Sequence, residues 1–348
     1  MPGEFDLIAR HFTRTDPKGV ALLGVGDDCA LLKPARGALA VSTDMLLEGR
    51  HFFPEVDPQA LGHKALAVNL SDLAAMGARP VAFTLALALP TVDDAWLAGL
   101  ARGLFTLADA HGCELIGGDT TRGPLALCLT VMGEVEPDLA LRRDGAHDGD
   151  DLWVSGSLGG AAWAVAHRQA TGGWARPASV ESTCFESAID RLHRPQPRVS
   201  LGLALLGLAS AAIDLSDGLA GDLGHVLKRS SEARGHELEA LIELERLPLH
   251  AVLAGLPEEH RWRLALAGGD DYELLFTAPA SRRSALNALG DRLGLDLTRI
   301  GRIQRLQDEA QPANRQAGGL RLIDRTGRLV PMQLQAHDHF KHHEPGQD

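Results

Sequence analysis

The sequence is poor in cysteine, in long hydrophobic runs and in clustered basic residues. The longest apolar runs, 81–89 and 201–213, are too short to cross a bilayer, and residues 1–6 lack the basic and apolar regions of a signal peptide. The few cysteines are scattered, without the spacing of a metal site: Cys29, Cys113, Cys128 and Cys184. We therefore expect free thiols in a reducing compartment and a cytoplasmic protein with no membrane partner.

Basic residues are outnumbered by acidic ones, and the formal net charge is -12. With no basic stripe, the sequence argues against a nucleic-acid partner. Its 348 residues favour two domains, and a hydrophobic content of 45% is ordinary for a globular protein. The polar, turn-rich stretch around 136–150 predicts a boundary between domains at 1–137 and 150–340.

No P-loop and no protein-kinase catalytic loop is found, but aspartates recur in unusual places. Asp57 and Pro58 predict the start of a helix, and Gly77 with Pro80 predicts its end. Asp72 lies inside this apolar, alanine-rich helix with no basic residue three or four positions away. The alternative interpretation is that Asp72 belongs to a solvated polar face.

Other acids follow predicted strands. Residues 38–43 predict a buried strand that ends in Ser42, Thr43 and Asp44, and Asp119 follows a strand predicted at 113–116. Carboxyl ends of strands are where α/β folds place ligand groups. In 24–32, the pair that includes Asp28 suits either a plain turn or a carboxylate aimed at a cation.

In the second half, residues 211–219 predict a strand-turn-helix joint that carries Asp214, Ser216 and Asp217. The structural alternative is that Ser216 or Asp217 caps the following helix. The glycine turn at 156–160 is a weak candidate for phosphate binding at a helix N-terminus, and residues 172–188 predict a variable loop. The histidine-rich end, 337–343, has spacing that can chelate a transition metal, although an exposed terminus is the plainer interpretation.

If several of these acids converge, their repulsion is large. Two carboxylates about 4 Å apart cost on the order of 4 kcal/mol at an effective dielectric of about 20, so such a cluster needs protons or cations. Neighbouring hydroxyls suit Mg²⁺ rather than Zn²⁺, which prefers histidine or cysteine. A site with several Mg²⁺ ions suits phosphoryl transfer from ATP, which depends on positioning and charge neutralisation.

The motifs together resemble the thiamine-monophosphate kinase family, within the superfamily of aminoimidazole ribonucleotide synthetase and selenophosphate synthetase. The resemblance extends from Gly3 to Phe340 and is carried by residues 26–30, 42–44, 68–77, 116–124 and 212–218. It implies an α+β/α/β chain with a two-domain aminoimidazole ribonucleotide synthetase-like fold. The N-terminal domain, a mixed sheet with helices, would bind ATP and Mg²⁺ and form a homodimer, and the C-terminal α/β domain would complete the active site.

The resemblance also implies the reaction and the site residues. ATP, as co-substrate, would phosphorylate thiamine monophosphate to thiamine diphosphate with several Mg²⁺ ions. The metals would be held by Asp28, Ser42, Thr43, Asp44, Asp72, Asp119, Asp214 and Asp217. The acids counted as catalytic among these are Asp28, Asp44, Asp72, Asp119 and Asp214. Nucleotide-binding positions are Gly118, Asp119, Arg143 and Ser216, and substrate-binding positions are His51 and Asp270.

The sequence departs from the family pattern at two places. Asp270 stands where the family usually has glutamate, one methylene longer, and Leu334 and His337 stand where aromatic residues are usual. Two other functions fit the pattern less well. A related ATP-dependent synthetase would need a different acceptor pocket, and a non-catalytic Mg²⁺-nucleotide-binding protein would need fewer acids.

Overall fold

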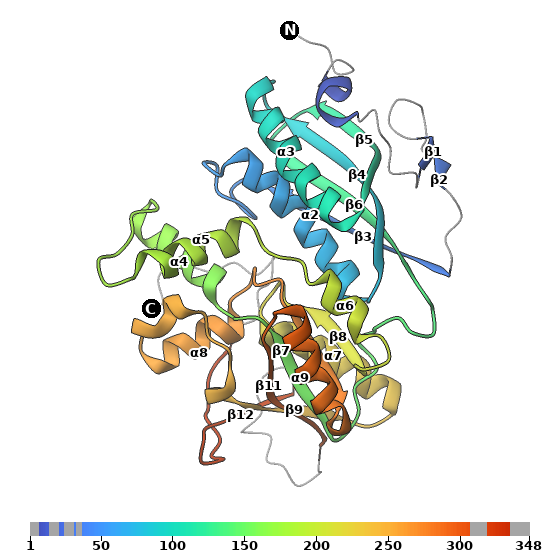
Figure 1. Ribbon diagram of the computed structural model, residues 1–348. Coiled ribbons are helices and arrows are strands. Elements are labelled where there is room, and N and C mark those ends of the chain that lie inside the picture. The colour runs from blue at the N-terminus through green and yellow to red at the C-terminus, as the bar shows by residue number, and fades with distance from the viewer. Residues whose placement is uncertain (1–6, 14–20, 24–30, 33–36, 307–318, 335–348) are drawn as a thin grey trace.

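Two β-sheets organise the molecule, one above the other in Figure 1. The computed structural model describes residues 7–13, 21–23, 31–32, 37–306 and 319–334. Ahead of the first sheet lie the short π-helix η1 (Ile8–Phe12) and the paired strands β1 (Ala21–Leu23) and β2 (Leu31–Leu32).

The first sheet has the order β3-β6-β4-β5. Strands β4 and β5 are parallel, and the other neighbours are antiparallel. The helices α2 and α3 cover one face of this sheet (Figure 1). The elements are β3 (Ala38–Leu47), α2 (Pro58–Ala75), β4 (Arg79–Leu89), α3 (Asp94–His111), β5 (Glu114–Arg122) and β6 (Ala126–Val135).

The two helices begin where the sequence predicts. The Asp57 carboxylate accepts a hydrogen bond of 2.9 Å from the Ala60 N–H, and Pro58 occupies the first turn. Asp93 caps α3 by accepting hydrogen bonds from the N–H groups of Ala95 and Trp96. Each cap satisfies donors that have no partner within the helix.

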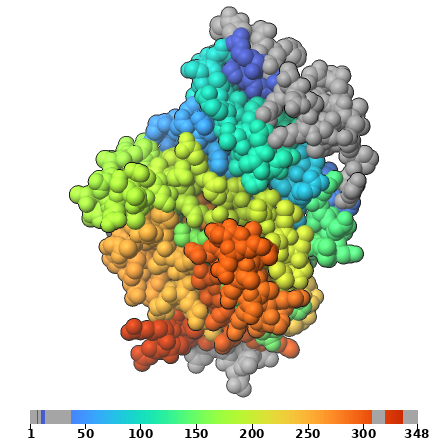
Figure 2. Space-filling model, in the orientation of Figure 1, coloured from blue at the N-terminus to red at the C-terminus, as the bar shows by residue number. Residues whose placement is uncertain are grey.

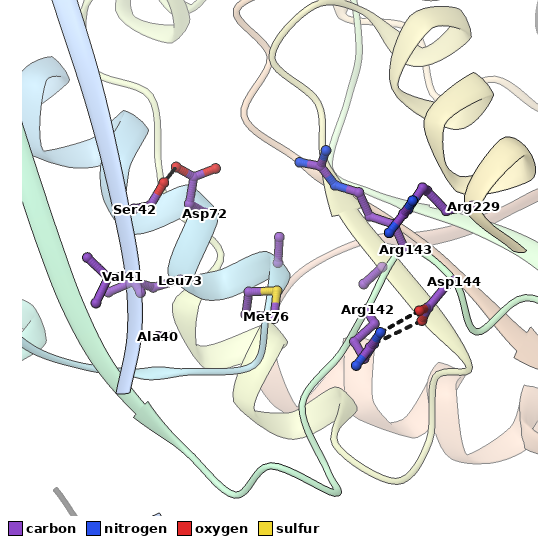
Figure 3. Close-up of a pocket in the computed structure, with 12 residues that line it drawn as sticks. Ala40, Val41, Ser42, Asp72, Leu73, Met76, Arg142, Arg143, Asp144 and Arg229 are labelled. Carbon is purple, nitrogen blue, oxygen red and sulfur yellow. Dashed lines mark hydrogen bonds and ion pairs between the residues drawn. The ribbon is translucent and has the colours of Figure 1, made fainter. Parts of the chain in front are cut away.

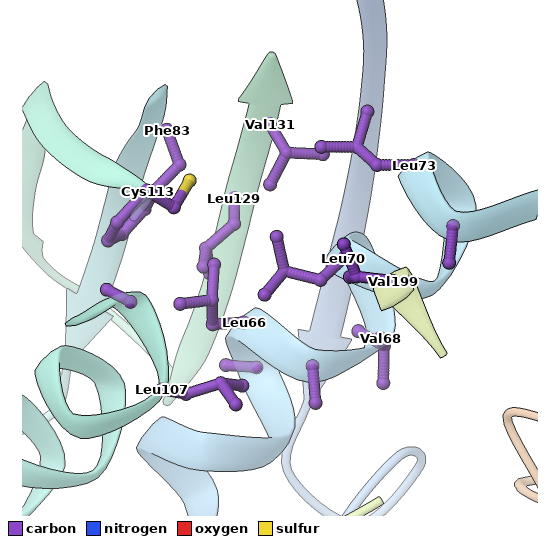
Figure 4. Close-up of a cluster of buried hydrophobic side chains, with 14 of the residues drawn as sticks. Leu66, Val68, Leu70, Leu73, Phe83, Leu107, Cys113, Leu129, Val131 and Val199 are labelled. Carbon is purple, nitrogen blue, oxygen red and sulfur yellow. The ribbon is translucent and has the colours of Figure 1, made fainter. Parts of the chain in front are cut away.

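Helix α2 is buried along almost its whole length, because the sheet lies on one side and α3 on another. Figure 4 shows Leu66, Leu70 and Leu73 of α2 facing Leu129 and Val131 of β6. The sequence predicts a single apolar stripe on this helix. The enclosure is more complete, so a carboxylate on α2 has little access to bulk water.

The second sheet has the order β12-β9-β11-β7-β10-β8, and only the pair β12 and β9 is parallel. Its strands are β7 (Asp150–Ser155), β8 (Ala211–Asp214), β9 (Leu238–Glu243), β10 (Leu274–Pro279), β11 (Leu297–Arg305) and β12 (Leu320–Ile323). Its helices are α4 (Gly160–Thr171), α5 (Ser182–His193), α6 (Val199–Leu205), α7 (Leu219–Arg234), α8 (Glu258–Ala267) and α9 (Arg283–Leu293). Short 3-10 turns are η2 (Leu244–Arg246), η3 (Ala251–Gly255) and η4 (Ala280–Arg282).

Helix α6 joins the two halves by packing on α2. A Cβ at Gly202 would lie 2.0 Å from the carbonyl oxygen of Ala74, so the helices approach as only glycine permits. Leu201 and Phe276 belong to the same buried cluster as Leu73. The two sheets thus share a continuous core, while α4 and α5 form a lobe at one side (Figures 1 and 2).

Three predicted boundaries are wrong. Strand β3 continues to Leu47 and β5 continues to Arg122, so 42–44 and Asp119 lie inside strands rather than at their ends. Residues 182–188 are helical rather than loop, as part of α5. The reason is pairing: β3 follows β6 over its full length, which keeps its polar residues in the sheet.

Two other expectations bear on the described residues. Among them, no helix is both long and apolar enough to cross a membrane. Cys113, Cys128 and Cys184 are free thiols, as expected. Cys29 and the histidine-rich end lie outside the described residues.

Candidate active site

A cavity of about 880 Å³ lies between the two halves of the chain. One wall comes from β3 and α2 and contributes Asp44 and Asp72. The opposite wall comes from the β8–α7 joint and the turn before β10, and it contributes Asp214, Asp217 and Asp270. Acids from distant parts of the sequence therefore line the same cavity.

Asp44 lines this cavity, and Ser42 shares its side of β3 because alternate residues of a strand point to opposite faces of the sheet. Both lie on the face toward α2. The Ser42 hydroxyl donates a hydrogen bond of 2.5 Å to the Asp72 carboxylate. The Asp44 N–H donates to the side-chain oxygen of the fully buried Asn69, whose own amide donates to the Ala65 carbonyl. One helix, α2, thus fixes both acids relative to each other.

The acids perturb one another strongly. Burial, with Asp72 and Asp217 nearby, raises the pKa of Asp44 from 3.8 to about 6. Burial and the Asp72 carboxylate raise the pKa of Asp214 from 3.8 to about 7. Burial also raises the pKa of Asp72, although the Ser42 hydrogen bond and the Arg143 charge oppose that rise. Such shifts mark carboxylates that a cation would stabilise.

Asp222, which the sequence analysis did not single out, contacts the acidic β8–α7 joint. It lies on α7, and its carboxylate accepts hydrogen bonds from the N–H groups of Ser216 (3.1 Å) and Asp217 (3.2 Å). Burial, with Asp214 and Asp217 nearby, raises the pKa of Asp222 to about 8. Neither Ser216 nor Asp217 caps α7, whose N-cap is Gly218 without a side-chain hydrogen bond. The available signal was an acid near the start of a helix that follows an acidic turn.

A smaller cavity of about 350 Å³ lies on the other side of Asp72. Figure 3 shows Ser42 and Asp72 on one side of this cavity and Arg143 with Arg229 on the other. Arg142 is paired with Asp144 and so is less available to a ligand. Arg143, predicted to bind nucleotide, therefore lines the smaller cavity. Asp72 lines both the smaller and the larger cavity.

The turn before β10 carries Asp270 in the left-handed region, with φ of 67°. Its N–H donates to the Ser216 carbonyl at 2.9 Å, which ties this turn to the β8–α7 joint. One Asp270 oxygen lies 3.3 Å from the Nζ of Lys64, a second residue that the sequence did not single out. His51, the other predicted substrate position, also lines the large cavity.

Buried contacts hold this turn from behind. Glu273 is fully buried and accepts hydrogen bonds from the side chains of Ser155, Arg191 and Arg198. The Asp271 carboxylate accepts from the Gly159 N–H at 3.0 and 3.1 Å, ahead of α4. A protein carboxylate therefore already occupies the glycine turn considered for phosphate binding.

Thr43 and Asp119 are not brought to the acids of their own chain. The register aligns Met45, Cys128, Ala86 and Asp119 in one row, so Asp119 points to the same face as the exposed Met45. It lies three strands from β3, about 14 Å across the sheet. Thr43 also faces that side and lies 2.8 Å from the Thr130 hydroxyl.

Gly118 lies in β5 against β4, and a Cβ there would lie 1.9 Å from the Leu85 carbonyl oxygen. The close packing of β5 on β4 therefore requires glycine at this position, whether or not a ligand binds there. Asp28, predicted as a metal ligand, lies outside the described residues.

The donor chemistry around Asp72 fits Mg²⁺. Asp44, Asp72, Asp214 and Asp217 offer carboxylate oxygens, and Ser42 offers a hydroxyl. Among the described residues, no three acidic, histidine or cysteine side chains already form a closed metal cage. Mg²⁺ needs no such cage, because it keeps several waters and uses one or two carboxylates with substrate phosphates. Four carboxylates that line one open cavity match that preference.

Comparison with known proteins finds a matching family model and similar sequences. Residues 26–135 match the family model described as AIR synthase related protein, N-terminal domain. Over 341 residues the chain is 45% identical to the thiamine-monophosphate kinase of Escherichia coli strain K12, which covers 97% of this chain and 98% of that protein.

Solved structures of thiamine-monophosphate kinases are similar to this chain. The crystal structure of thiamine-monophosphate kinase from Stenotrophomonas maltophilia K279a has 46% identity and a TM-score of 0.78, covering 91% of this chain and 94% of that one. The complex of AaThiL with AMPPCP and TMP has 27% identity and a TM-score of 0.70, covering 96% of each chain. These likenesses confirm the two-domain fold expected from the sequence.

Proposed function

We propose, since the chain belongs to the thiamine-monophosphate kinase family, that it transfers the γ-phosphoryl group of ATP in line to the phosphate of thiamine monophosphate with the help of Mg²⁺. The family membership rests on the near-complete match to the Escherichia coli enzyme. The AaThiL complex with AMPPCP, an ATP analogue, and TMP supports both ligands.

The observation that carries the mechanism is the position of Asp72. It lines the cavity that holds Arg143 and also the cavity that holds His51 and Asp270. Two phosphorylated ligands that enter from these two sides would meet at Asp72. In-line transfer requires the attacking and leaving oxygens to lie on opposite sides of the transferred group, and two cavities that share one residue provide such an arrangement.

Asp44, Asp72, Asp214 and Asp217, with the Ser42 hydroxyl, would hold Mg²⁺ at this junction. Bound Mg²⁺ would neutralise charge on the two phosphate groups, which otherwise repel each other. The acceptor is a phosphate oxygen that is already anionic near neutral pH, so no general base is needed. The role of the protein groups is to orient both ligands and to keep water out of the junction.

The same proposal includes a homodimer. The face of the first sheet opposite α2 exposes apolar side chains of β3: Leu39, Val41, Met45 and Leu47. Exposed apolar patches of this kind mark interfaces. A second copy packed there would also approach Thr43 and Asp119. With β3 and β5 at opposite edges of the sheet, a two-fold axis would set β5 of one copy beside β3 of the other.

This dimer predicts that Asp119 serves the site of the other copy, and two inactive variants test the idea. Asp72→Asn and Asp119→Asn are purified, mixed and allowed to exchange subunits. If Asp119 acts across the interface, half of the dimers have one intact site, so roughly a quarter of wild-type activity returns. Absence of any recovery after confirmed subunit exchange would show that Asp119 acts within its own chain or not at all.

The activity is tested by incubating the protein with ATP, Mg²⁺ and thiamine monophosphate and by measuring thiamine diphosphate and ADP. Equal amounts of both products are expected. Release of phosphate with ADP, but without thiamine diphosphate, would favour a related synthetase, and nucleotide binding without turnover would favour a non-catalytic protein. The cytoplasmic location and the absence of a nucleic-acid partner stay predictions from the sequence.

A further inference from the structure

Lys64 is a buried cation in a cavity dominated by acids. Only 2% of the residue is exposed, yet it lines the large cavity. Its ammonium has an ion-pair partner in Asp270, at 3.3 Å, whose side chain remains 29% exposed. Burial of a lysine is expensive unless the charge is paired, so this pair has to be maintained or replaced whenever the cavity fills.

Lys64 lies on the same face of α2 as Asp72. Lys64, Val68 and Asp72 are spaced four residues apart, so they lie on one face of the helix, and all three line the same cavity. The rise from Lys64 to Asp72 is about 12 Å. One helix face thus presents an ammonium group at one end and the expected metal-binding carboxylate at the other.

The other basic groups of this cavity are less suited to an anion. Arg50 lies on the exposed turn after β3. Burial and the Lys64 charge lower the pKa of His193 to about 4, so this imidazole is neutral at pH 7. Among the described residues that line the cavity, Lys64 is therefore the buried positive charge, and five aspartates line the same cavity: Asp44, Asp72, Asp214, Asp217 and Asp270.

We propose that the Lys64 ammonium binds the phosphate group of the acceptor substrate, exchanging its contact with Asp270 for the phosphate oxygens. The inference rests on the proposed function, which makes thiamine monophosphate the acceptor. That molecule carries an anionic phosphate and a cationic thiazolium ring, so its charges match the Lys64–Asp270 pair. Lys64 takes the phosphate, and Asp270 is left facing the cationic ring.

The test compares two ligands that differ only in the phosphate. Affinities of thiamine monophosphate and of thiamine are measured by calorimetry on the full-length wild-type protein and on Lys64→Met. A charged hydrogen bond contributes about 1.5–3 kcal/mol, so Lys64→Met should weaken thiamine monophosphate binding by about 10- to 100-fold. Thiamine binding should change by less than about threefold, since thiamine has no phosphate for Lys64 to hold. Lys64→Arg should recover part of the loss.

The matched control is Lys228→Met, which removes an exposed lysine from α7 outside this cavity and should change neither affinity. Lys64→Met leaves Asp270 without its cation, so folding is checked by thermal unfolding. If that variant is unstable, Lys64→Met/Asp270→Leu removes both charges together, and the ratio of the two ligand affinities is measured on it.

Equal weakening of thiamine and thiamine monophosphate in the lysine variants would overturn the proposal and make the pair purely structural. An unchanged affinity for both ligands would overturn it as well. These outcomes differ from a failure of the proposed function, because that failure would appear in the wild-type protein as an absence of thiamine diphosphate.

Discussion

The Ser42 hydroxyl on β3 donates a hydrogen bond of 2.5 Å to the Asp72 carboxylate on α2. The contact joins two elements that are 30 residues apart in sequence. It also orients Asp72, which borders both cavities. Because the hydroxyl donates to the charged form, it opposes the rise that burial causes in the pKa of Asp72.

We expect Asp72→Asn to lower kcat by on the order of 100-fold or more while the fold is kept. The variant removes a charge that would hold Mg²⁺, and metal-based charge stabilisation contributes several kcal/mol to phosphoryl transfer. The measurement is steady-state kinetics at saturating ATP and Mg²⁺, with thermal unfolding as a check of folding. Ser42→Ala serves as the milder companion, because it keeps the carboxylate and removes one donor. A kcat near that of the wild type in Asp72→Asn would rule out the metal role.

Asp222 is expected to position the Asp214–Asp217 loop for metal binding. Asp222→Ala leaves the part-buried N–H groups of Ser216 and Asp217 without their acceptor, a loss of at most about 1–3 kcal/mol for each group. We expect the Mg²⁺ concentration for half-maximal activity to rise by about 10- to 100-fold.

Asp222→Asn is the control, because both N–H groups donate to the same carboxylate oxygen, Oδ2, and an amide oxygen in its place can accept both while the negative charge is lost. It should fall between the wild type and Asp222→Ala in Mg²⁺ dependence, and direct Mn²⁺ binding by electron paramagnetic resonance should follow the same order. Should both variants titrate with Mg²⁺ like the wild type, Asp222 would be a residue of the fold alone.

The metal-free protein should lose stability, relative to Asp214→Asn, as the pH rises. The pKa of Asp214 is about 7 in the fold against 3.8 ordinarily, so between these values the folded chain holds a proton that the unfolded chain releases. Unfolding then becomes easier with rising pH. Asp214→Asn lacks this titration, and its melting temperature should exceed that of the wild type by a margin that grows from about pH 4 to pH 7.

Mg²⁺ provides the second half of this test. Binding of the cation requires the deprotonated carboxylate, so added Mg²⁺ should raise the melting temperature of the wild type at pH 8 more than at pH 6. It should do so far less in Asp214→Asn. A margin that stays constant with pH in the absence of metal would contradict the raised pKa.

The open face of the first sheet predicts the effect of a charge at Val41, which is 58% exposed. Val41→Glu should convert the proposed dimer to a monomer in sedimentation experiments, because the interface would bury an unpaired carboxylate. Val92→Glu is the matched control, since Val92 is 42% exposed but lies in the loop before α3. Dimers that persist in Val41→Glu would place the interface elsewhere.

Much of the local structure could be predicted from the residues. Asp57 and Asp93 cap α2 and α3 as expected, and Gly112 ends α3 in the left-handed conformation. These are short-range effects, decided by one side chain and the backbone beside it. The unusual setting of Asp72 and the acidic joint at 214–217 were visible for the same reason, because an acid in an apolar segment stands out locally.

Strand register and burial were decided over longer distances. Thr43 follows Ser42 directly, yet the pleat turns it to the opposite face, where its hydroxyl meets Thr130. Asp119 lies in the middle of an edge strand because β4 pairs with β5 over its length. Lys64 gives no local sign of its role, because its partner Asp270 is more than 200 residues away.

The amino-acid sequence alone determined the family, the helix caps and the supply of oxygen ligands, since each of these depends on residue identity and close spacing. Only the tertiary structure decided which acids share a cavity, which lie on the opposite face of the first sheet, and which cation lies beside them. The physical reason is that carboxylate repulsion, burial and ion pairing depend on distances through space, and the packing of α2 between two sheets sets those distances.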